Sequence, residues 1–288
     1  MTDQAALMPE VEPSARTSGK GEARRPTRHH IERVPKVLLV PALMTLAFLA
    51  LPVIALVTQT SLVDLPARVT DPVVLEALRL SLITSLISTL LCAVFGIPLA
   101  WLMARANLPF GRALRVLVVL PLVLPPVAGG LGLSLFFGGD SAAGRLLSTI
   151  GVTLPGSTAG VVVAQTFVAL PFLVLAAEGA IRGVDPRLEG VAATLGASPL
   201  RIFRRVTLAL ALPGVVAGLV LAWARSLGEF GATVTFVGSI PGRTDTLPLA
   251  LSRALKESTS AGVAVGVVLL VLSASVLLLL RDRWWSVT

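Results

Sequence analysis

The chain has 288 residues, of which 55% are apolar and only 14% are charged. Soluble domains carry about 25% charged residues, so this composition excludes an ordinary soluble protein and favours one built for a lipid bilayer. The formal net charge of +8 is then expected to orient loops across the membrane rather than to attract nucleic acid. The single cysteine, Cys92, excludes an intrachain disulfide. With only two histidines in the chain, we expect neither a metal site nor a cofactor bound by these residues.

Residues 1–36 differ in composition from the rest of the chain. They are rich in Pro, Ser, Gly and charge and contain no long apolar run, so they cannot bury enough surface to fold. The apolar segment that follows is too long for a signal peptide and lacks a small-residue cleavage pattern. We therefore predict a disordered basic cytoplasmic tail at 1–36, a transmembrane domain at 37–283 and a short C-terminal tail at 284–288.

Six stretches are apolar over the roughly 20 residues that a membrane-spanning helix requires. The predicted spans cover residues 37–57, 72–103, 115–137, 157–180, 213–237 and 260–280. The connections alternate in charge, since one set is rich in arginine and the opposite set contains few basic residues. The positive-inside rule places the arginine-rich set, and with it both termini, in the cytoplasm. The sequence thus predicts an all-α, multi-pass protein of the cell membrane with six transmembrane helices.

Two of the predicted spans carry unusual residues. The stretch LPLVLPPVAGGLGL (residues 120–133) places prolines and glycines at membrane depth, where a broken backbone is tolerated only beside protein or a water-filled cavity. In the second span, Ser81, Thr84, Ser85 and Ser88 recur at helical spacing. We interpret this polar face as a place where another helix packs closely.

Two charged residues, Arg225 and Glu229, lie within the fifth predicted span. A charge inside a membrane is costly, so such residues normally face the interior of the helix bundle. The four-residue spacing places both side chains on one helix face, where they can pair. Two interpretations remain equally open: a self-neutralised structural pair, or an arginine that helps an anion to cross while the glutamate holds it in position.

The segment LEGVAATLGASPLRIFRRVTLALALPG (residues 188–214) lies between the fourth span and the apolar part of the fifth. Just before it, Asp185 followed by Pro186 is an N-cap with a first-turn proline, which predicts the start of a short helix. Gly196 ends this helix, because glycine tolerates the left-handed conformation at a helix C-terminus. A Ser-Pro pair at Ser198 repeats the start signal, so we predict two short helices joined by a tight turn on the cytoplasmic side.

The same segment has an alternative interpretation as a DNA-binding unit. Ala192, Gly196 and Ile202 match the spacing of DNA-binding helix-turn-helix units. Such a unit needs a third helix for its core, and with membrane spans on both sides a duplex would have to lie against the bilayer. We therefore expect no nucleic acid partner. A protein partner fits better, since a short helix with an apolar face can insert into a groove of a soluble subunit.

The same segment resembles the cytoplasmic EAA loop of ATP-binding-cassette (ABC) importer permeases. In that motif Glu-Ala-Ala is followed by three further residues and then glycine, and the motif ends in Leu-Pro. Counting back from Gly196, the motif's glutamate falls on Gly190 and its alanines fall on Val191 and Ala192. Glu189 lies one position early, and the Leu-Pro of this chain comes later than the motif places it.

Three other stretches narrow the resemblance. LPLVLPPVAGG, SLGEFGATVTFVG and GSIPGRTDTLPLAL together are similar to the permease subunit of molybdate importers. Sulfate permeases share the Gly-Glu-Phe-Gly region, but IPGRTDTLPLA (residues 240–250) is closer to the molybdate branch. The resemblance therefore indicates an oxyanion importer for molybdate, with sulfate or tungstate as alternatives.

Several expectations follow from this resemblance. It implies a type I ABC importer permease fold, a homodimer in the lipid bilayer, two ATPase subunits that bind ATP and Mg²⁺, and an extracytoplasmic oxyanion-binding protein. The chain itself has no Walker-type phosphate-binding loop, so we expect a transport subunit rather than an enzyme, with residues 181–212 as its coupling loop. The expected ATPase-coupling residues are Glu189, Gly190, Ala192, Leu195 and Gly196, and the expected translocation-path residues are Arg225 and Glu229.

The competing class is a stand-alone channel or ion-coupled carrier. It would also need six spans and polar positions inside the membrane. It would not need a capped helix pair in the cytoplasm, and carriers usually contain inverted repeats, which we do not find in this sequence.

Overall fold

The computed structural model describes residues 36–59, 70–106 and 109–285. All secondary structure in these ranges is helical, and no strand occurs among them, which confirms the predicted all-α class. Of the tail predicted at 1–36 only Lys36 is described, and of the predicted C-terminal tail the last three residues lie outside the described ranges.

Helix α1 (Lys36–Thr58) is described by itself. After its first residue it contains no charged side chain, and its large apolar side chains, such as Val37, Met44 and Phe48, are exposed. A helix that is apolar around its whole circumference is typical of a membrane span. Its bounds match the first predicted span closely.

Four more long helices follow: α3 (Pro72–Arg105), α7 (Thr158–Arg182), α10 (Leu208–Leu227) and α13 (Thr259–Trp285). Within the described ranges, five helices are long and apolar enough to cross a membrane, and a sixth crossing results if one bent helix pair is counted as a span. The second, fourth and sixth predicted spans match α3, α7 and α13 to within a few residues. Apolar length is a local property, so these spans could be placed without knowing their neighbours.

The third predicted span is broken. Helices α4 (Gly111–Val123) and α5 (Pro126–Phe137) meet at an angle of 114°. Leu124 and Pro125 are extended, because each precedes a proline ring that disfavours the helical conformation of the residue before it. The predicted interruption of the helix is thus confirmed.

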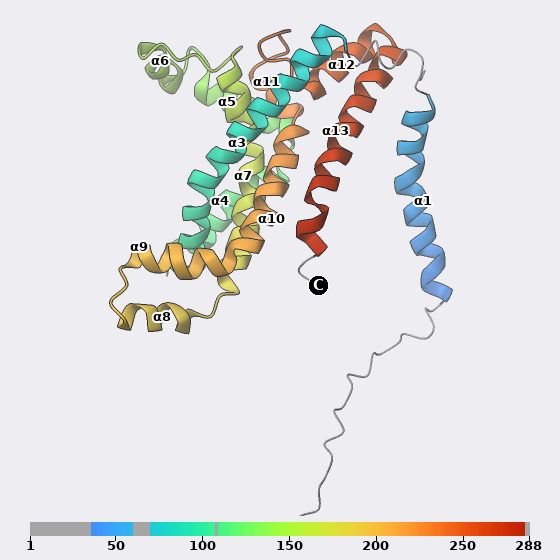
Figure 1. Cartoon of the computed structure of the whole chain (residues 1–288). Helices are drawn as coiled ribbons and strands as arrows, with labels where there is room; N and C mark the ends of the chain where they lie inside the picture. The colour runs from blue at the N-terminus through green and yellow to red at the C-terminus, as the bar shows by residue number, and fades with distance from the viewer. Residues whose placement is uncertain (1–35, 60–69, 107–108, 286–288) are drawn as a thin grey trace, which may run out of the picture. The chain divides into compact units, whose positions relative to one another are not determined.

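The fifth predicted span, 213–237, was wrong at its beginning. The chain is helical without interruption from α9 (Pro199–Ile202) through a π-helical turn, η1 (Phe203–Thr207), into α10. Pro213 lies inside α10 rather than at its start, as membrane helices tolerate when neighbouring groups satisfy the freed backbone. The second short helix predicted at Ser198 is therefore not a separate helix but continues into α10, and its α9 part lies across the end of the bundle (Figure 1).

The end of that predicted span was also wrong. Helix α10 ends at Leu227, with Gly228 as its C-cap. A separate short helix, α11 (Gly231–Phe236), follows. The glycine interrupts the helix because it lacks the side chain that would stabilise a continued turn, so the second half of 213–237 is a different element.

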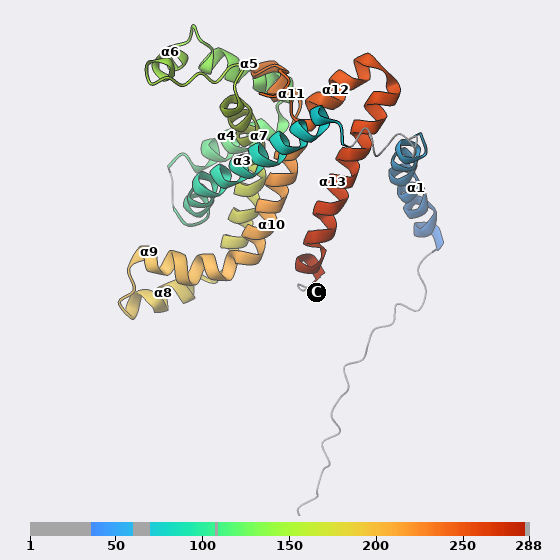
Figure 2. The same ribbon diagram turned by 45° about the horizontal axis from the view of Figure 1, so that its top comes forward.

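Helices α3, α7 and α10 pack side by side and form the centre of the bundle (Figures 1 and 2). Their apolar core includes the fully buried side chains of Leu173 and Val174 on α7. The serine and threonine face of α3 is turned into this packing, since all four of its side chains are completely buried. Ser88 bonds to Ser226 of α10 at 3.1 Å and accepts a bond from Thr166 of α7 at 3.2 Å. The packing interpretation of that face is thus supported by polar contacts between the three helices.

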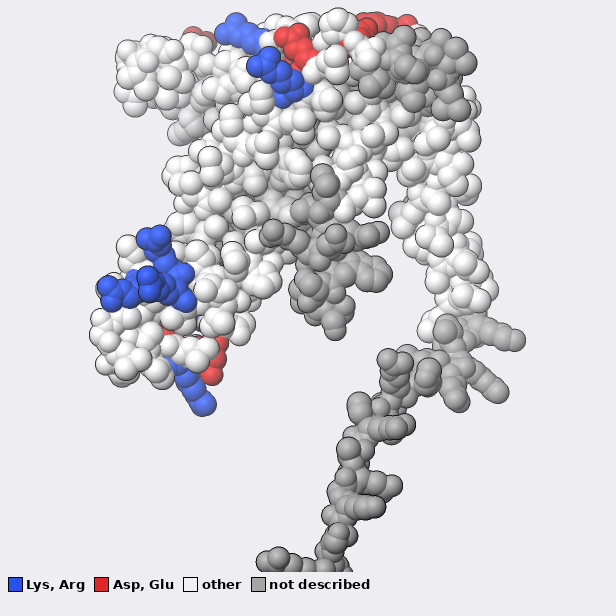
Figure 3. Space-filling view, in the orientation of Figure 1, with Lys and Arg blue, Asp and Glu red and all other residues white. Residues whose placement is uncertain are grey.

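The two ends of this bundle carry different elements (Figure 1). Helix α8 (Pro186–Thr194) and α9 lie at one end, while α6 (Ala142–Thr149), α11 and α12 (Leu247–Glu257) lie at the other. Basic side chains, all of them arginine, gather over α8 and α9 beside a few acidic ones, whereas basic and acidic side chains are mixed at the opposite end (Figure 3). This asymmetry matches the arginine-rich connections that the positive-inside rule uses.

Candidate functional site

Local capping residues determine where helix α8 begins and where it ends. The carboxylate of Asp185 accepts the backbone N–H of Arg187 at 2.9 Å, and Pro186 occupies the first helical position. At the other end, Gly196 has φ of +81°. Its N–H donates to Ala193 O at 3.0 Å, and the next N–H, of Ala197, donates to Ala192 O at 3.0 Å. These paired bonds form a Schellman motif, so the predicted helix and its glycine stop are both confirmed.

One face of α8 is apolar and exposed. Leu188, Val191 and Leu195 are 48%, 58% and 82% exposed, and their spacing places them on one stripe along the helix. Leu195 was expected to face a partner, but Leu188 and Val191 were not among the expected coupling residues. The repeat of apolar residues at this spacing is the signal in the sequence that could have identified them.

The opposite face of α8 is turned toward the bundle. Glu189 and Ala192 are half-buried, and the Glu189 carboxylate forms an ion pair with Arg105 at 2.9 Å. The same oxygen accepts the hydroxyl of Thr207 at 2.8 Å. Of the five expected coupling residues, the structure therefore places Gly190, Leu195 and Gly196 on the exposed surface and turns the other two inward.

Arg225 and Glu229 pair as predicted, with 2.5 Å between Arg225 Nη1 and Glu229 Oε2. They do not share a helix, because α10 ends before Glu229. The other carboxylate oxygen, Oε1, accepts the backbone N–H of Ala232 at 2.7 Å and so caps the start of α11. Glu229 is 1% exposed and Arg225 is 27% exposed. The pair therefore ties the end of α10 to α11 and leaves part of the guanidinium accessible.

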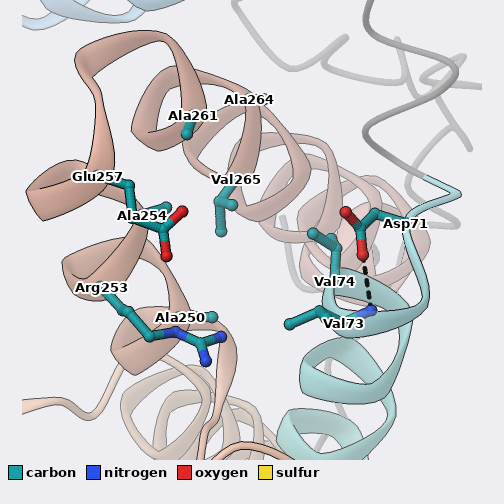
Figure 4. A pocket seen from close by; sticks show the side chains of 10 residues that line it. All are labelled: Asp71, Val73, Val74, Ala250, Arg253, Ala254, Glu257, Ala261, Ala264 and Val265. Atoms are coloured by element: carbon teal, nitrogen blue, oxygen red, sulfur yellow. Dashed lines mark hydrogen bonds between the residues drawn. The ribbon is translucent and has the colours of Figure 1, made fainter.

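A cavity of about 260 Å³ lies at the other end of the bundle, between the beginning of α3, α12 and α13 (Figure 4). Its charged lining consists of Asp71, Arg253 and Glu257. Asp71 caps α3 through Val73 N–H at 2.8 Å, and Arg253 is paired with Asp245 at 2.6 Å. Because its carboxylates outnumber its guanidinium group, this cavity does not suit an anion.

The sequence and fold were compared with known proteins. Residues 96–283 match the family described as binding-protein-dependent transport system inner membrane component. The chain belongs to this family. This permease is therefore a multi-pass membrane protein and a transport subunit rather than an enzyme, and the family works together with a binding protein, which argues against a stand-alone channel or ion-coupled carrier.

Individual members of this family were compared with the chain. The chain is 46% identical to the molybdenum transport system permease protein ModB of Mycobacterium tuberculosis, over 85% of this chain and 93% of the relative. It is 41% identical to ModB of Escherichia coli, over 73% of this chain and 92% of the relative. The sulfate transport system permease protein CysT of Salmonella typhimurium is 33% identical over 80% of this chain and 84% of its own length.

The permease also shares its fold with a solved structure. A bacterial ABC transporter involved in the import of the acidic polysaccharide alginate superimposes with a TM-score of 0.69 at 18% identity. The match covers 88% of this chain and 95% of that one. The predicted type I ABC importer permease fold is thereby confirmed.

Proposed function

We propose that this permease is the membrane subunit of an ATP-driven molybdate importer. The observation that carries the proposal is the identity to molybdenum permeases over most of both chains, 46% and 41%. A sulfate permease is less similar, at 33%, so sulfate, and tungstate with its closely similar shape, are the alternatives. The test is to reconstitute the permease with its ATPase and binding protein and to measure which oxyanion stimulates ATP hydrolysis. Stimulation by sulfate but not by molybdate would contradict the assignment.

The assembly we propose is a homodimer of the permease with two ATPase subunits, which bind ATP and Mg²⁺, and an extracytoplasmic binding protein that delivers the oxyanion. The α8 end and both termini then lie in the cytoplasm. The concentration of arginine over α8 and α9 (Figure 3) supports this orientation, because cytoplasmic loops carry an excess of basic residues.

The ATPase docks on α8 in this proposal. The exposed stripe of Leu188, Val191 and Leu195 supports it, since a helix presents apolar side chains at this spacing to a groove on a partner. Gly190 and Gly196 flank the stripe and leave the helix backbone accessible. Movement of the ATPase subunits would displace α8 and, through it, the membrane spans.

Replacement of Leu195 by aspartate tests this docking. Leu195 is 82% exposed, so Leu195→Asp should leave the fold intact while it places a charge in the apolar contact. We expect the ATPase to be lost when the permease is purified by an affinity tag. Thr194→Asp, an exposed change at the neighbouring position, is the matched control and should retain the ATPase. Retention of the ATPase by Leu195→Asp would exclude the stripe as the docking surface.

The second part of the proposal assigns the Arg225–Glu229 region to the anion path. A partly accessible guanidinium beside a buried carboxylate can attract an oxyanion while the carboxylate keeps the arginine in place. The doubly substituted Arg225→Gln/Glu229→Gln protein separates the two interpretations, because it removes both charges and leaves none unpaired. Loss of molybdate uptake at normal membrane levels supports the path role. Normal uptake would leave only the structural pair.

A further inference from the structure

Arg105, the last residue of α3, joins three segments that are far apart in the sequence. Its Nε and Nη2 donate to Glu189 Oε1 at 3.1 and 2.9 Å. Nη2 also donates to the backbone oxygen of Val184 at 2.8 Å, in the connection that leads into α8. Thr207, at the end of η1, donates to the same carboxylate oxygen at 2.8 Å. The end of α3, the coupling helix α8 and the beginning of the fifth span thus meet at one carboxylate.

The burial of this cluster strengthens the interactions among its three side chains. The side chains of Arg105 and Glu189 are 15% and 20% exposed, and Thr207 is completely buried. Water is largely excluded, so the attraction between the charges is screened less than in a pair on the surface. Hydrogen bonds that involve charged partners are also shorter and stronger than neutral ones. Displacement of α8 must therefore carry its two neighbours with it or break several bonds at once.

The backbone around Thr207 is suited to transmit such a displacement. η1 is a π-helical turn, and turns of this kind occur as single bulges inside α-helices, frequently at functional sites. The ring of Phe203 at its start packs edge-on against Trp101 of α3, with 5.7 Å between the ring centroids. A polar contact at Thr207 and an aromatic contact at Phe203 thus both link this turn to its surroundings near the end of α3.

We propose that Glu189 is a positioning residue that fastens α8 to the end of α3 and to the beginning of the fifth span. Displacement of α8 is then transmitted to two spans at the same time. The inference rests on the proposed docking of the ATPase on α8, and it assigns Glu189 a role different from the ATPase contact that the sequence suggested. The carboxylate acts on the spans through Arg105 and Thr207, while the exposed stripe holds the ATPase.

The test uses the complete transporter, reconstituted in liposomes with its ATPase and binding protein and supplied with molybdate. Glu189→Gln removes the negative charge and keeps the shape of the side chain, whereas Arg105→Gln removes the positive charge and shortens the side chain. We expect the ATPase to remain bound and ATP hydrolysis to continue, while uptake per ATP hydrolysed falls about 10-fold, a change within the usual range of coupling between sites. The double variant should be no worse than either single one, because all three lack the same ion pair.

Two further variants complete the design. The exchanged pair Arg105→Glu/Glu189→Arg restores opposite charges and should recover part of the lost coupling. Thr207→Val removes one hydrogen bond and should lower uptake per ATP less than the charge variants do. Arg187→Gln changes an exposed arginine on α8 and is the control, which should leave uptake per ATP hydrolysed unchanged.

Two outcomes would overturn the inference. Unchanged uptake per ATP in both single variants would show that the cluster does not transmit movement. Loss of the ATPase from Glu189→Gln but not from Arg105→Gln would show instead that Glu189 contacts the ATPase directly. The Leu195→Asp experiment reports on docking independently, so a failure of the docking proposal is distinguishable from a failure of the fastening role.

Discussion

The indole N–H of Trp223 on α10 donates to the hydroxyl of Ser85 on α3 at 2.9 Å. Ser85 is completely buried, and the bond joins two helices that both run beside α7. Its partners are 138 residues apart in the chain. In an apolar bundle, an indole N–H without an acceptor would be costly, so this contact fixes how α10 is rotated against α3.

We expect Ser85→Ala to destabilise the bundle, because it leaves the Trp223 N–H unpaired. Polar contacts between membrane helices contribute about 0.6 kcal/mol on average, and an unsatisfied donor adds to that loss. Thermal unfolding in detergent should show a lower Tm for both Ser85→Ala and Trp223→Phe. The loss in the double variant should be smaller than the sum of the two single losses, because both changes remove the same hydrogen bond. Ser275→Ala, an exposed serine on α13, is the control. Strict additivity of the two changes would contradict the contact.

Helices α5 and α11 approach so closely that Gly130 tolerates no side chain. A Cβ at Gly130 would lie 2.6 Å from the backbone oxygen of Ala232, whereas a Cβ at Gly132 on the same helix would have no atom within 4 Å. We expect Gly130→Ala to lower the free energy of unfolding by about 2 kcal/mol, since overpacking forces the backbone to shift. Gly132→Ala should leave stability unchanged or raise it by up to about 1 kcal/mol through helix propensity. Equal Tm values for the two variants in detergent would contradict the close approach.

Removal of Arg225 and removal of Glu229 should lower the free energy of unfolding by different amounts. Arg225→Gln leaves a carboxylate that is 1% exposed without its counter-charge, whereas Glu229→Gln leaves a guanidinium that is 27% exposed and can be hydrated. We expect Arg225→Gln to cost about 3 kcal/mol of the free energy of unfolding, and Glu229→Gln to cost less. The double variant should be more stable than Arg225→Gln alone. Thermal unfolding of the three proteins checks the order, and a reversed order would show that the carboxylate has another neutralising partner.

Gly196 should be required for coupling because of its backbone conformation. Its φ of +81° is one that a β-branched residue adopts only with strain of roughly 1–2 kcal/mol, so Gly196→Val should distort the end of α8. We expect the permease to reach the membrane normally while uptake per ATP hydrolysed falls. Gly183→Val, before the same helix, is the matched control, since Gly183 has an ordinary φ of −69°. Normal coupling in Gly196→Val would exclude a need for this turn geometry.

Features that depend on neighbouring residues could be predicted from the sequence. Apolar length located the spans that became α1, α3, α7 and α13. The capping residues Asp185 and Gly196 located α8 to within one residue, because an N-cap carboxylate and a left-handed glycine act on the backbone beside them. The prolines of residues 120–133 likewise indicated a broken span, since the steric effect of a proline ring is local.

Other features were decided only by contacts between distant segments. The sequence placed Glu189 on α8 but not its direction, which depends on Arg105, 84 residues away in the chain. The pattern of apolar residues also started the fifth span at Pro213, although the helix begins at Pro199 and ends at Leu227. Helix ends and side-chain directions follow from which partners satisfy each polar group, and only the packing of α3, α8 and α10 brings those partners together.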